Sequence, residues 1–449
     1  MDDDKTLYCI KGFRSLLDFQ IQLNSGLNVI VGPNGAGKTN FIEFLDFINS
    51  LIRFGAANAV SMSGGVSKVF STENFNKKTP LLSCEITSTA LINTSEDKIE
   101  LNKNFRFRYF IEVKFNKTES QIYISKEKIT VYKCHDPHET VVSLQKVGSI
   151  QITRNGISDF LEPKLHITDR IYAKSERNPF SYTRPIYGRK EIKDAFDRTD
   201  IQSLEPDQSI LSVRPVFSAI DAMRRVIGRG KSFNIIPEKA RNADHISRSP
   251  FIEPDGTGLS SVLYFLKKLK DGNFAKAPYA FRVLDPDAFS TVMHWTNLVL
   301  PELEDINITQ DLHLGRYVVT LSIRKEKPLR VSIQAASDGT IKWLTLICLI
   351  VTNRGMGCLE EPENFLHPKM QSYLVEIIRD SINEHGRDYF IITTHSETLI
   401  NSCKPEELII FQFGSSGTKC IRLSHPSKIK AEINDTGFGL GYYYAANAL

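Results

Sequence analysis

The sequence has few cysteines, little excess charge and no long apolar run, and each shortage argues against a class of protein. The seven cysteines among 449 residues are scattered, odd in number and never spaced as C-x-x-C. This usage is typical of free thiols in a reducing compartment rather than of a disulfide framework. Lysine and arginine exceed aspartate and glutamate by only four charges. No overall positive field therefore predicts nucleic-acid binding, although local patches could still supply it.

Membrane and fibrous structures are also disfavoured. No apolar run approaches the length of a membrane-spanning helix, and the first residues, MDDDK, are acidic where a signal peptide would be basic and apolar. We therefore expect a cytoplasmic protein without membrane contact. Residues 116–325 sustain no heptad pattern, which argues against a long coiled-coil arm. With 41% hydrophobic residues the chain can bury a sizeable core, and its length suggests two to three domains or one elaborated domain.

The strongest motif is a glycine-rich loop between a strand pattern and a helix pattern. Residues 27–40 read LNVIVGPNGAGKTN and contain a G-x-x-x-x-G-K-[ST] loop. Its backbone N–H groups cradle phosphates, Lys38 reaches the β/γ-phosphates, and the Thr39 hydroxyl binds Mg²⁺. The helix that follows adds the positive end of its dipole. The sequence therefore predicts an ATP site with Mg²⁺, in which the nucleotide is bound by Asn34, Gly35, Ala36, Gly37, Lys38, Thr39 and Asn40.

The N-terminal segments have mainly strand patterns. Residues 7–13 and 17–23 are strand candidates, and residues 105–115 and 121–124 are predicted to be neighbours in an antiparallel sheet. Arg14 follows the first strand. Its side chain either folds back toward the nucleotide or lies on the surface at a turn.

The middle of the chain offers helices and two weaker functional patterns. Helices are predicted at residues 38–54, 210–227 and 259–269. Residues 134–138 read CHDPH and gather potential metal ligands, but Pro137 favours a turn and no second cluster follows. Residues 172–190 interleave cations with aromatic residues, which fits either a solvated surface or a nucleic-acid contact. DNA is therefore a candidate partner.

Further motifs follow in the last third of the chain. After a strand pattern at residues 317–323, Ser337 and Gly339 precede an apolar helix at residues 341–351. Serine and glycine at a helix start leave N–H groups that can face phosphate oxygens. Taken alone, this pattern also fits an ordinary capped helix.

Two carboxylates and a histidine follow short apolar strands. Glu360 and Glu361 begin the segment EEPENFLHP, and Glu360 is suited to hold Mg²⁺, directly or through water. Glu361 is suited to orient or deprotonate the attacking water. The strand that starts near residue 389 ends in His395, which is placed to hydrogen-bond a γ-phosphate. Glu361 and His395 are the predicted catalytic residues, and Thr39 and Glu360 the predicted metal ligands.

The phosphate loop, SDGT, EEPE with LHP, and TTHS, in that order, resemble the RecF-like and SMC-like branch of the ABC ATPases. The resemblance implies an α/β, ABC-type nucleotide-binding domain with a β-rich lobe, a compact helical insertion and no long coiled coil. In that family Ser337 and Gly339 would be the signature that contacts the nucleotide of the opposite subunit. His395 would be the switch histidine, and Arg14 the arginine that reaches the nucleotide.

The resemblance covers the two ends of the chain and shows departures. It predicts halves of the ATPase domain at residues 1–115 and 315–449, separated by a mixed β and helical insertion at residues 116–314. Glu360 stands where the superfamily usually has aspartate, and Asp338 where it usually has glycine. The glutamine of the Q-loop has no evident counterpart.

Within the superfamily the chain looks most like the stand-alone ATPases of anti-phage systems, such as the Septu and PARIS ATPases and the ATPase half of the OLD nucleases. The 54 residues after His395 are too few for a Toprim domain. The resemblance implies a homodimer or higher homo-oligomer with ATP between subunits, and a separate effector, an HNH or Toprim nuclease. A RecF-like DNA-repair ATPase that clamps duplex DNA, and a nucleotide-dependent scaffold with little turnover, are the alternatives.

Overall fold

The computed structural model describes residues 5–96, 99–133, 146–154, 164–167, 203–212, 218–228, 230–272, 284–325, 329–352, 357–385 and 389–446. The chain divides into two compact units that alternate along the sequence. Unit 1 comprises Met1–Ser25, Gly32–Gly230 and Phe411–Ile421. Unit 2 comprises Gly26–Val31, Lys231–Ile410 and Arg422–Leu449. Each unit is therefore built from segments that lie far apart in the sequence.

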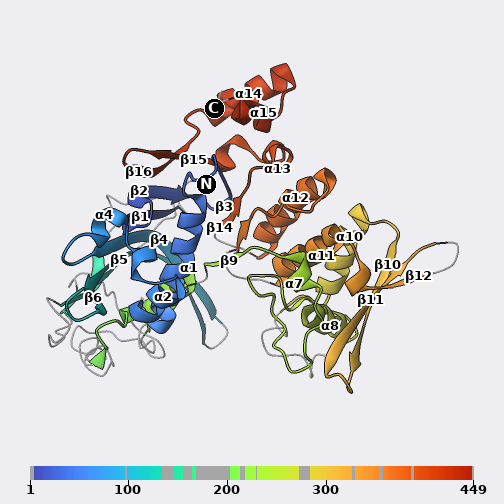
Figure 1. Ribbon diagram of the computed structural model, residues 1–449, viewed down its shortest axis with the longest axis horizontal. Coiled ribbons are helices and arrows are strands. Elements are labelled where there is room, and N and C mark those ends of the chain that lie inside the picture. The colour runs from blue at the N-terminus through green and yellow to red at the C-terminus, as the bar shows by residue number, and fades with distance from the viewer. Residues whose placement is uncertain are drawn as a thin grey trace. The chain divides into compact units, whose positions relative to one another are not determined.

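Unit 1 is built on a seven-stranded antiparallel sheet in the order β2-β1-β4-β5-β6-β7-β8, of which Figure 1 labels β1, β2, β4, β5 and β6. Its strands are β1 (Thr6–Phe13), β2 (Leu16–Leu23), β4 (Leu81–Glu96), β5 (Ile99–Asn116), β6 (Gln121–Lys133), β7 (Lys146–Thr153) and β8 (Lys164–Ile167). The two N-terminal strands are confirmed. The prediction that residues 105–115 and 121–124 are antiparallel neighbours is confirmed, since β5 pairs with β6 and Val113 lies opposite Ile124.

The helices of unit 1 begin with the one that follows the phosphate loop. They are α1 (Lys38–Phe54), α2 (Ala56–Met62), α3 (Val66–Val69), α4 (Thr72–Phe75) and α6 (Ser218–Ile227), with a 3-10 turn at Ile210–Ser212. Phe44 and Phe47 of α1 pack on Phe13 of β1, with ring centroids 5.3 and 5.4 Å away. Of the helix predicted at residues 210–227, the described residues contain the 3-10 turn and α6, and residues 213–217 lie outside the described part.

Unit 2 contains parallel strands in the order β15-β3-β14-β13-β9, with β16 beside β15. The strands are β3 (Gly26–Val31), β9 (Lys231–Phe233), β13 (Gly357–Glu360), β14 (Tyr389–Thr393), β15 (Leu408–Gly414) and β16 (Gly417–Arg422). Beyond Ile410, β15 and most of β16 belong to unit 1. All five residues of β14 are buried, as expected for a parallel strand covered on both faces.

Helices and a small antiparallel sheet complete unit 2. The sheet has the order β10-β11-β12, with strands β10 (Leu303–Asp311), β11 (Arg316–Ile323) and β12 (Leu329–Ser332). The helices are α7 (Pro237–Ala240), α8 (Leu259–Lys270), α10 (Ala288–Val299), α11 (Asp338–Thr352), α12 (Pro368–His385), α13 (Glu397–Asn401), α14 (Pro426–Thr436) and α15 (Leu440–Ala445), with 3-10 turns at Ile333–Ala335 and Pro405–Glu407. The helices predicted at residues 259–269 and 341–351 and the strand at residues 317–323 are confirmed.

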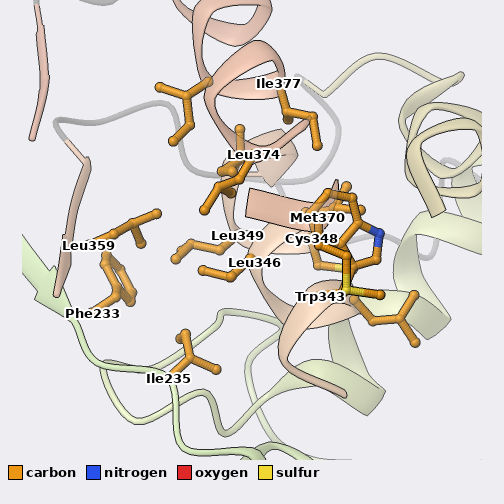
Figure 2. Packing of buried hydrophobic residues seen from close by; sticks show 14 of the residues in the cluster. Phe233, Ile235, Trp343, Leu346, Cys348, Leu349, Leu359, Met370, Leu374 and Ile377 are labelled. Carbon is orange, nitrogen blue, oxygen red and sulfur yellow. The ribbon is translucent and has the colours of Figure 1, made fainter. Parts of the chain in front are cut away.

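The core of unit 2 is centred on α11. Residues 341–350 of this helix are all buried, so it is covered on every side by other elements. Figure 2 shows Leu346 and Leu349 gathered with Leu359 of β13 and Leu374 of α12. The strand that ends in Glu360 and the helix that begins after Ser337 are thereby anchored in one hydrophobic cluster.

The described residues agree with the expected mixed α/β class. Their longest helix, α12, has 18 residues, so this part of the chain contains no coiled-coil arm. No helix among the described residues combines the length and hydropathy needed to span a bilayer. The six described cysteines are free thiols, as predicted, and Cys134 lies outside the described residues.

Candidate functional site

The predicted phosphate loop connects β3 to α1, and its last glycine is required by both conformation and space. Gly37 precedes α1 with a φ of 95°, a left-handed conformation that glycine adopts at little cost. A side-chain carbon at this position would lie 2.1 Å from Thr418 Oγ1 and 3.0 Å from Ser15 Oγ. Any larger residue must therefore both strain the backbone and displace these hydroxyls.

Lys38 lies against the loop that it is predicted to serve. Its side chain is almost buried, and Nζ donates to the carbonyl oxygens of Gly32 at 2.8 Å and Pro33 at 3.3 Å. Thr39, the next residue, is exposed. The Lys38 ammonium is thus held by backbone oxygens of the loop, and the residue that follows it in sequence, Thr39, is accessible to solvent.

The tip of the loop faces solvent. Asn34 and Gly35 are exposed, whereas Ala36 is buried and its N–H donates to the carbonyl oxygen of Pro33 at 3.1 Å. The tip is therefore accessible to a ligand, while one N–H of the loop is used within it.

Asn40 links the start of α1 to residues outside the loop through a hydrogen bond. Its Nδ2 donates to Ser15 Oγ at 2.7 Å, and the hydroxyls of Ser15 and Thr418 lie 2.7 Å apart. The Thr418 N–H donates to the Ser15 carbonyl oxygen at 2.9 Å. Sequence reasoning gave no role to Ser15 or Thr418, because no local pattern links residues 403 positions apart.

Arg14 is held by the helix that follows the loop. Its backbone has a φ of 45°, and its N–H donates to the Val69 carbonyl oxygen at 3.0 Å. The guanidinium forms an ion pair with Glu43 of α1 and donates to the Ser63 carbonyl oxygen at 3.4 Å. Burial lowers the pKa of this guanidinium from its ordinary value. In the structure the Arg14 side chain therefore packs against α1 of its own unit and does not extend freely into solvent.

In unit 2 the carboxyl ends of three neighbouring strands meet at one edge of the sheet. Thr393 of β14 lies opposite Glu360 of β13 on one side and Ile30 of β3 on the other. Glu361 extends this pairing, since its N–H donates to the Thr393 carbonyl oxygen at 2.9 Å. Ligands of parallel α/β sheets bind outside the carboxyl ends of the strands. This edge is also where β3 continues along the chain into the phosphate loop.

Glu361 and His395 face each other. Glu361 Oε1 lies 3.8 Å from His395 Nε2, and Glu361 Oε2 accepts a hydrogen bond from Asn364 Nδ2 at 3.1 Å. Glu361 has a φ of 41°, a conformation that costs a residue with a side chain of the order of 1 kcal/mol. Both side chains remain partly accessible to solvent. The structure thus brings the two predicted catalytic residues together.

Glu363, to which the sequence assigned no role, connects this loop to the end of β14. Its Oε1 accepts hydrogen bonds from Thr394 Oγ1 at 2.7 Å and from the His395 N–H at 2.9 Å. The third glutamate of EEPE is therefore the side chain that binds the histidine segment. The sequence could not indicate this role, because Glu363 lies 31 positions before Thr394 and 32 positions before His395 along the chain.

The predicted signature residues lie at the start of α11. Ser337 Oγ accepts a hydrogen bond from the Thr340 N–H at 3.2 Å, so Ser337 caps its own helix and is exposed. A side-chain carbon at Gly339 would lie 2.8 Å from the carbonyl oxygen of Phe365. Gly339 therefore allows the start of α11 to approach the loop that carries the glutamates.

Lys342 is a buried cation one turn further along α11. Only 1% of its surface is exposed, and Nζ donates to the Ile235 carbonyl oxygen at 2.8 Å. Burial lowers the pKa of Lys342 from 10.5 to about 8, against the opposing effect of the carboxylates of Glu363 and Glu361. The sequence placed this residue in an apolar helix and gave it no role.

The predicted site residues divide between the two units. Unit 1 contains Arg14, Asn34, Gly35, Ala36, Gly37, Lys38, Thr39 and Asn40, and unit 2 contains Ser337, Gly339, Glu360, Glu361 and His395. The two predicted metal ligands, Thr39 and Glu360, thus fall in different units.

The two weaker patterns of the middle region lie outside the described residues. These are the CHDPH cluster at residues 134–138 and the basic and aromatic segment at residues 172–190. Within the described residues no group of three or more histidine, cysteine, aspartate and glutamate side chains is arranged to hold a metal ion.

Comparison with known folds gives weak global similarities. The "Crystal structure of the SmcHead bound to the C-winged helix domain of ScpA" is 13% identical and has a TM-score of 0.45, covering 94% of this chain and 98% of that chain. The "SMC head domain from Thermotoga maritima" is 11% identical, with a TM-score of 0.38 and coverage of 94% and 99%. An Smc head with an extended coiled coil, bound to the C-terminal domain of ScpA from Pyrococcus furiosus, is 12% identical, with a TM-score of 0.43 and coverage of 97% and 100%. These scores are too low to transfer a function.

Two family models match the sequence itself. Residues 9–204 match "AAA ATPase domain", and residues 192–401 match "AAA domain, putative AbiEii toxin, Type IV TA system". No curated protein matches the sequence. The matched segments contain the phosphate loop, both strand-end carboxylates and His395. The chain is therefore similar to AAA-type ATPase domains over most of its length, and this similarity supports an ATP-binding protein of the ATPase class.

Proposed function

We propose that the chain binds ATP with Mg²⁺ at the phosphate loop and hydrolyses it. The observation that carries the proposal is the edge of the unit 2 sheet, where β13 ends in Glu360 beside the end of β14, the strand before His395, and β14 in turn lies beside β3. β3 continues along the chain into the phosphate loop, so the strands that precede the loop, His395 and the two glutamates belong to one sheet. The matches to ATPase family models support the same reading.

Each residue has a separate role in the proposed reaction. Lys38 and the N–H groups of the loop bind the phosphates, aided by the dipole of α1. Thr39 and Glu360 supply hydroxyl and carboxylate oxygens, the donors that Mg²⁺ prefers. Glu361 orients or deprotonates the attacking water, and His395 hydrogen-bonds the γ-phosphate. The segments 1–115 and 315–449 would thus carry the nucleotide chemistry and 116–314 the insertion.

The direct test separates binding from hydrolysis. Glu361→Gln keeps the shape and hydrogen bonding of the side chain but removes its negative charge. We expect the variant to bind ATP with parent affinity and to release phosphate roughly a hundredfold more slowly, as expected for loss of a general base. Phosphate release and ATP titration measure the two effects. A variant that hydrolyses ATP at the parent rate would exclude Glu361 as the base.

A second part of the proposal is that ATP assembles two or more copies of the chain. It is supported by Ser337, which lies exposed at the start of the 15-residue helix α11, a position where the helix dipole favours an anion from outside the protomer. Ser337→Arg should leave ATP binding intact and abolish ATP-dependent association and hydrolysis together. Scattering measurements of mass with and without ATP test this, with Thr352→Arg at the far end of α11 as the control.

The biological role that we propose is control of a separate effector in anti-phage defence. It is supported by the family description that mentions an AbiEii toxin and a type IV TA system, and by the compact insertion expected from the sequence. Co-purification with the product of an adjacent nuclease gene, in the presence and absence of ATP, tests the role. Tight binding of duplex DNA without such a partner would favour the alternative of a DNA-clamping repair ATPase.

A further inference from the structure

The loop between β13 and α12 binds the histidine segment through one side chain. Glu363 Oε1 accepts hydrogen bonds from both the hydroxyl of Thr394 and the main-chain N–H of His395. Thr394 is fully buried, so solvent does not compete for its hydroxyl. A carboxylate that accepts two hydrogen bonds holds the segment more strongly than a neutral side chain would.

Other contacts fix the residues on both sides of His395. The Ser396 N–H donates to Thr394 Oγ1 at 2.9 Å, and Ser396 Oγ donates to Gln371 Oε1 at 2.5 Å. The Gln371 Nε2 in turn donates to the Leu366 carbonyl oxygen at 3.0 Å. The main chain around His395 is therefore clamped, while its imidazole stays partly exposed toward Glu361.

The second oxygen of Glu363 has a different environment. Oε2 is buried and makes no hydrogen bond among the described residues. A buried carboxylate oxygen without a donor is costly unless a nearby positive charge compensates it. Lys342 is the buried cation of α11, whose start approaches this loop closely enough that a side-chain carbon at Gly339 would lie 2.8 Å from the Phe365 carbonyl oxygen. Glu363 is also the carboxylate that most raises the pKa of Lys342 against the effect of burial.

We propose that Glu363 is a positioning residue that sets His395 against Glu361, and that Lys342 supplies its countercharge from the helix that begins at Ser337. The inference rests on the proposed ATPase function. It adds a physical connection within one protomer, from the start of α11 through Lys342 and Glu363 to His395. A contact at Ser337 that shifts α11 would thereby alter the geometry of the histidine.

The first test removes the carboxylate. Glu363→Ala should lower ATP hydrolysis by roughly ten- to a hundredfold, the range expected when an outer support of a reacting group is lost. ATP affinity should change less than about twofold, because Lys38 and the other phosphate-loop residues proposed to bind the nucleotide are unchanged. Glu376→Ala, an exposed glutamate of α12, is the matched control and should behave as the parent.

The second test asks whether the two charges are coupled. Glu363→Gln keeps an acceptor for Thr394 and His395 but leaves the Lys342 charge uncompensated, so its hydrolysis should fall by about tenfold. Adding Lys342→Met should restore much of that loss, because no unpaired charge remains. If the two substitutions each lower the hydrolysis rate and their effects multiply in the double variant, Lys342 is not the countercharge of Glu363.

Amide hydrogen exchange gives a readout that does not depend on hydrolysis. In Glu363→Ala the amide of His395 should exchange at least about tenfold faster than in the parent, while the buried amides of β14 keep their protection. Uniformly faster exchange across unit 2 would indicate a purely structural role and overturn the inference. If the parent hydrolyses ATP and the Glu363→Ala variant hydrolyses it at the same rate, the inference is wrong while the proposed function stands. A parent without hydrolysis overturns the proposed function, and the inference with it.

Discussion

The phosphate loop and the carboxylate–histidine region are shaped by different means. In the loop, backbone conformation dominates, because Gly37 has a positive φ and Lys38 binds the carbonyl oxygens of its own loop. In the second region, side chains dominate, because Glu363 and Gln371 bind the segment around His395. A contiguous stretch thus defines the first region, while long-range side-chain contacts define the second. Substitutions should consequently damage the two regions in different ways.

The largest expected effect is in the loop. Lys38→Ala removes the only cation of the phosphate loop, and charged hydrogen bonds to phosphate contribute about 3 kcal/mol together. We expect ATP affinity to fall by roughly a hundredfold or more. Titration with ATP measures the change, and Lys68→Ala, an exposed lysine of α3, serves as the control. Unchanged affinity would contradict the phosphate-loop assignment.

A comparable effect, on stability rather than affinity, is expected in the second region. The pKa of Lys342 is about 8 in the folded protein and 10.5 ordinarily, so the unfolded chain binds more protons between these pH values. The free energy of unfolding of the parent should therefore rise with pH from about 8 to about 10.5 relative to Lys342→Met. The rise should reach at most about 3.5 kcal/mol, at about 1.4 kcal/mol per pKa unit.

Denaturant titrations of both proteins across this pH range test the prediction. Below pH 8 the difference between parent and variant should stay constant, because both states of the parent hold the proton. A difference that is independent of pH up to 10.5 would mean that the ammonium is not desolvated in the folded protein.

A smaller effect separates two glycines of the same loop. Gly35→Ala and Gly37→Ala both place a side chain at positive φ, at a cost of roughly 1–2 kcal/mol each. Only at Gly37 does the added carbon also meet Thr418 and Ser15, whereas nothing lies within 4 Å at Gly35. We expect Gly37→Ala to lose about 1–3 kcal/mol more stability than Gly35→Ala. Equal losses, measured by denaturant unfolding, would show that the contact with Thr418 does not constrain the loop.

The same contrast explains how far the sequence predicted the structure. The loop, the helix at residue 38 and the buried strand before His395 follow from contiguous patterns, and the structure confirms these elements. The supports of the site do not, because Ser15 meets Thr418 and Glu363 meets Thr394 only after distant segments pair. The role of Lys342 could not be predicted from the sequence for another reason. Its neighbours in α11 are apolar, so periodicity indicated a buried helix without showing what a buried cation does there.

The most direct test of the proposed ATPase is the rate of phosphate release by the purified chain with ATP and Mg²⁺, compared among the parent, Lys38→Ala and Glu361→Gln. We predict that the parent hydrolyses ATP, that Lys38→Ala neither binds nor hydrolyses it, and that Glu361→Gln binds ATP without hydrolysing it. Binding lost in Glu361→Gln as well, or phosphate released equally fast by all three proteins, would contradict the division of binding and hydrolysis between the loop and the carboxylate–histidine region.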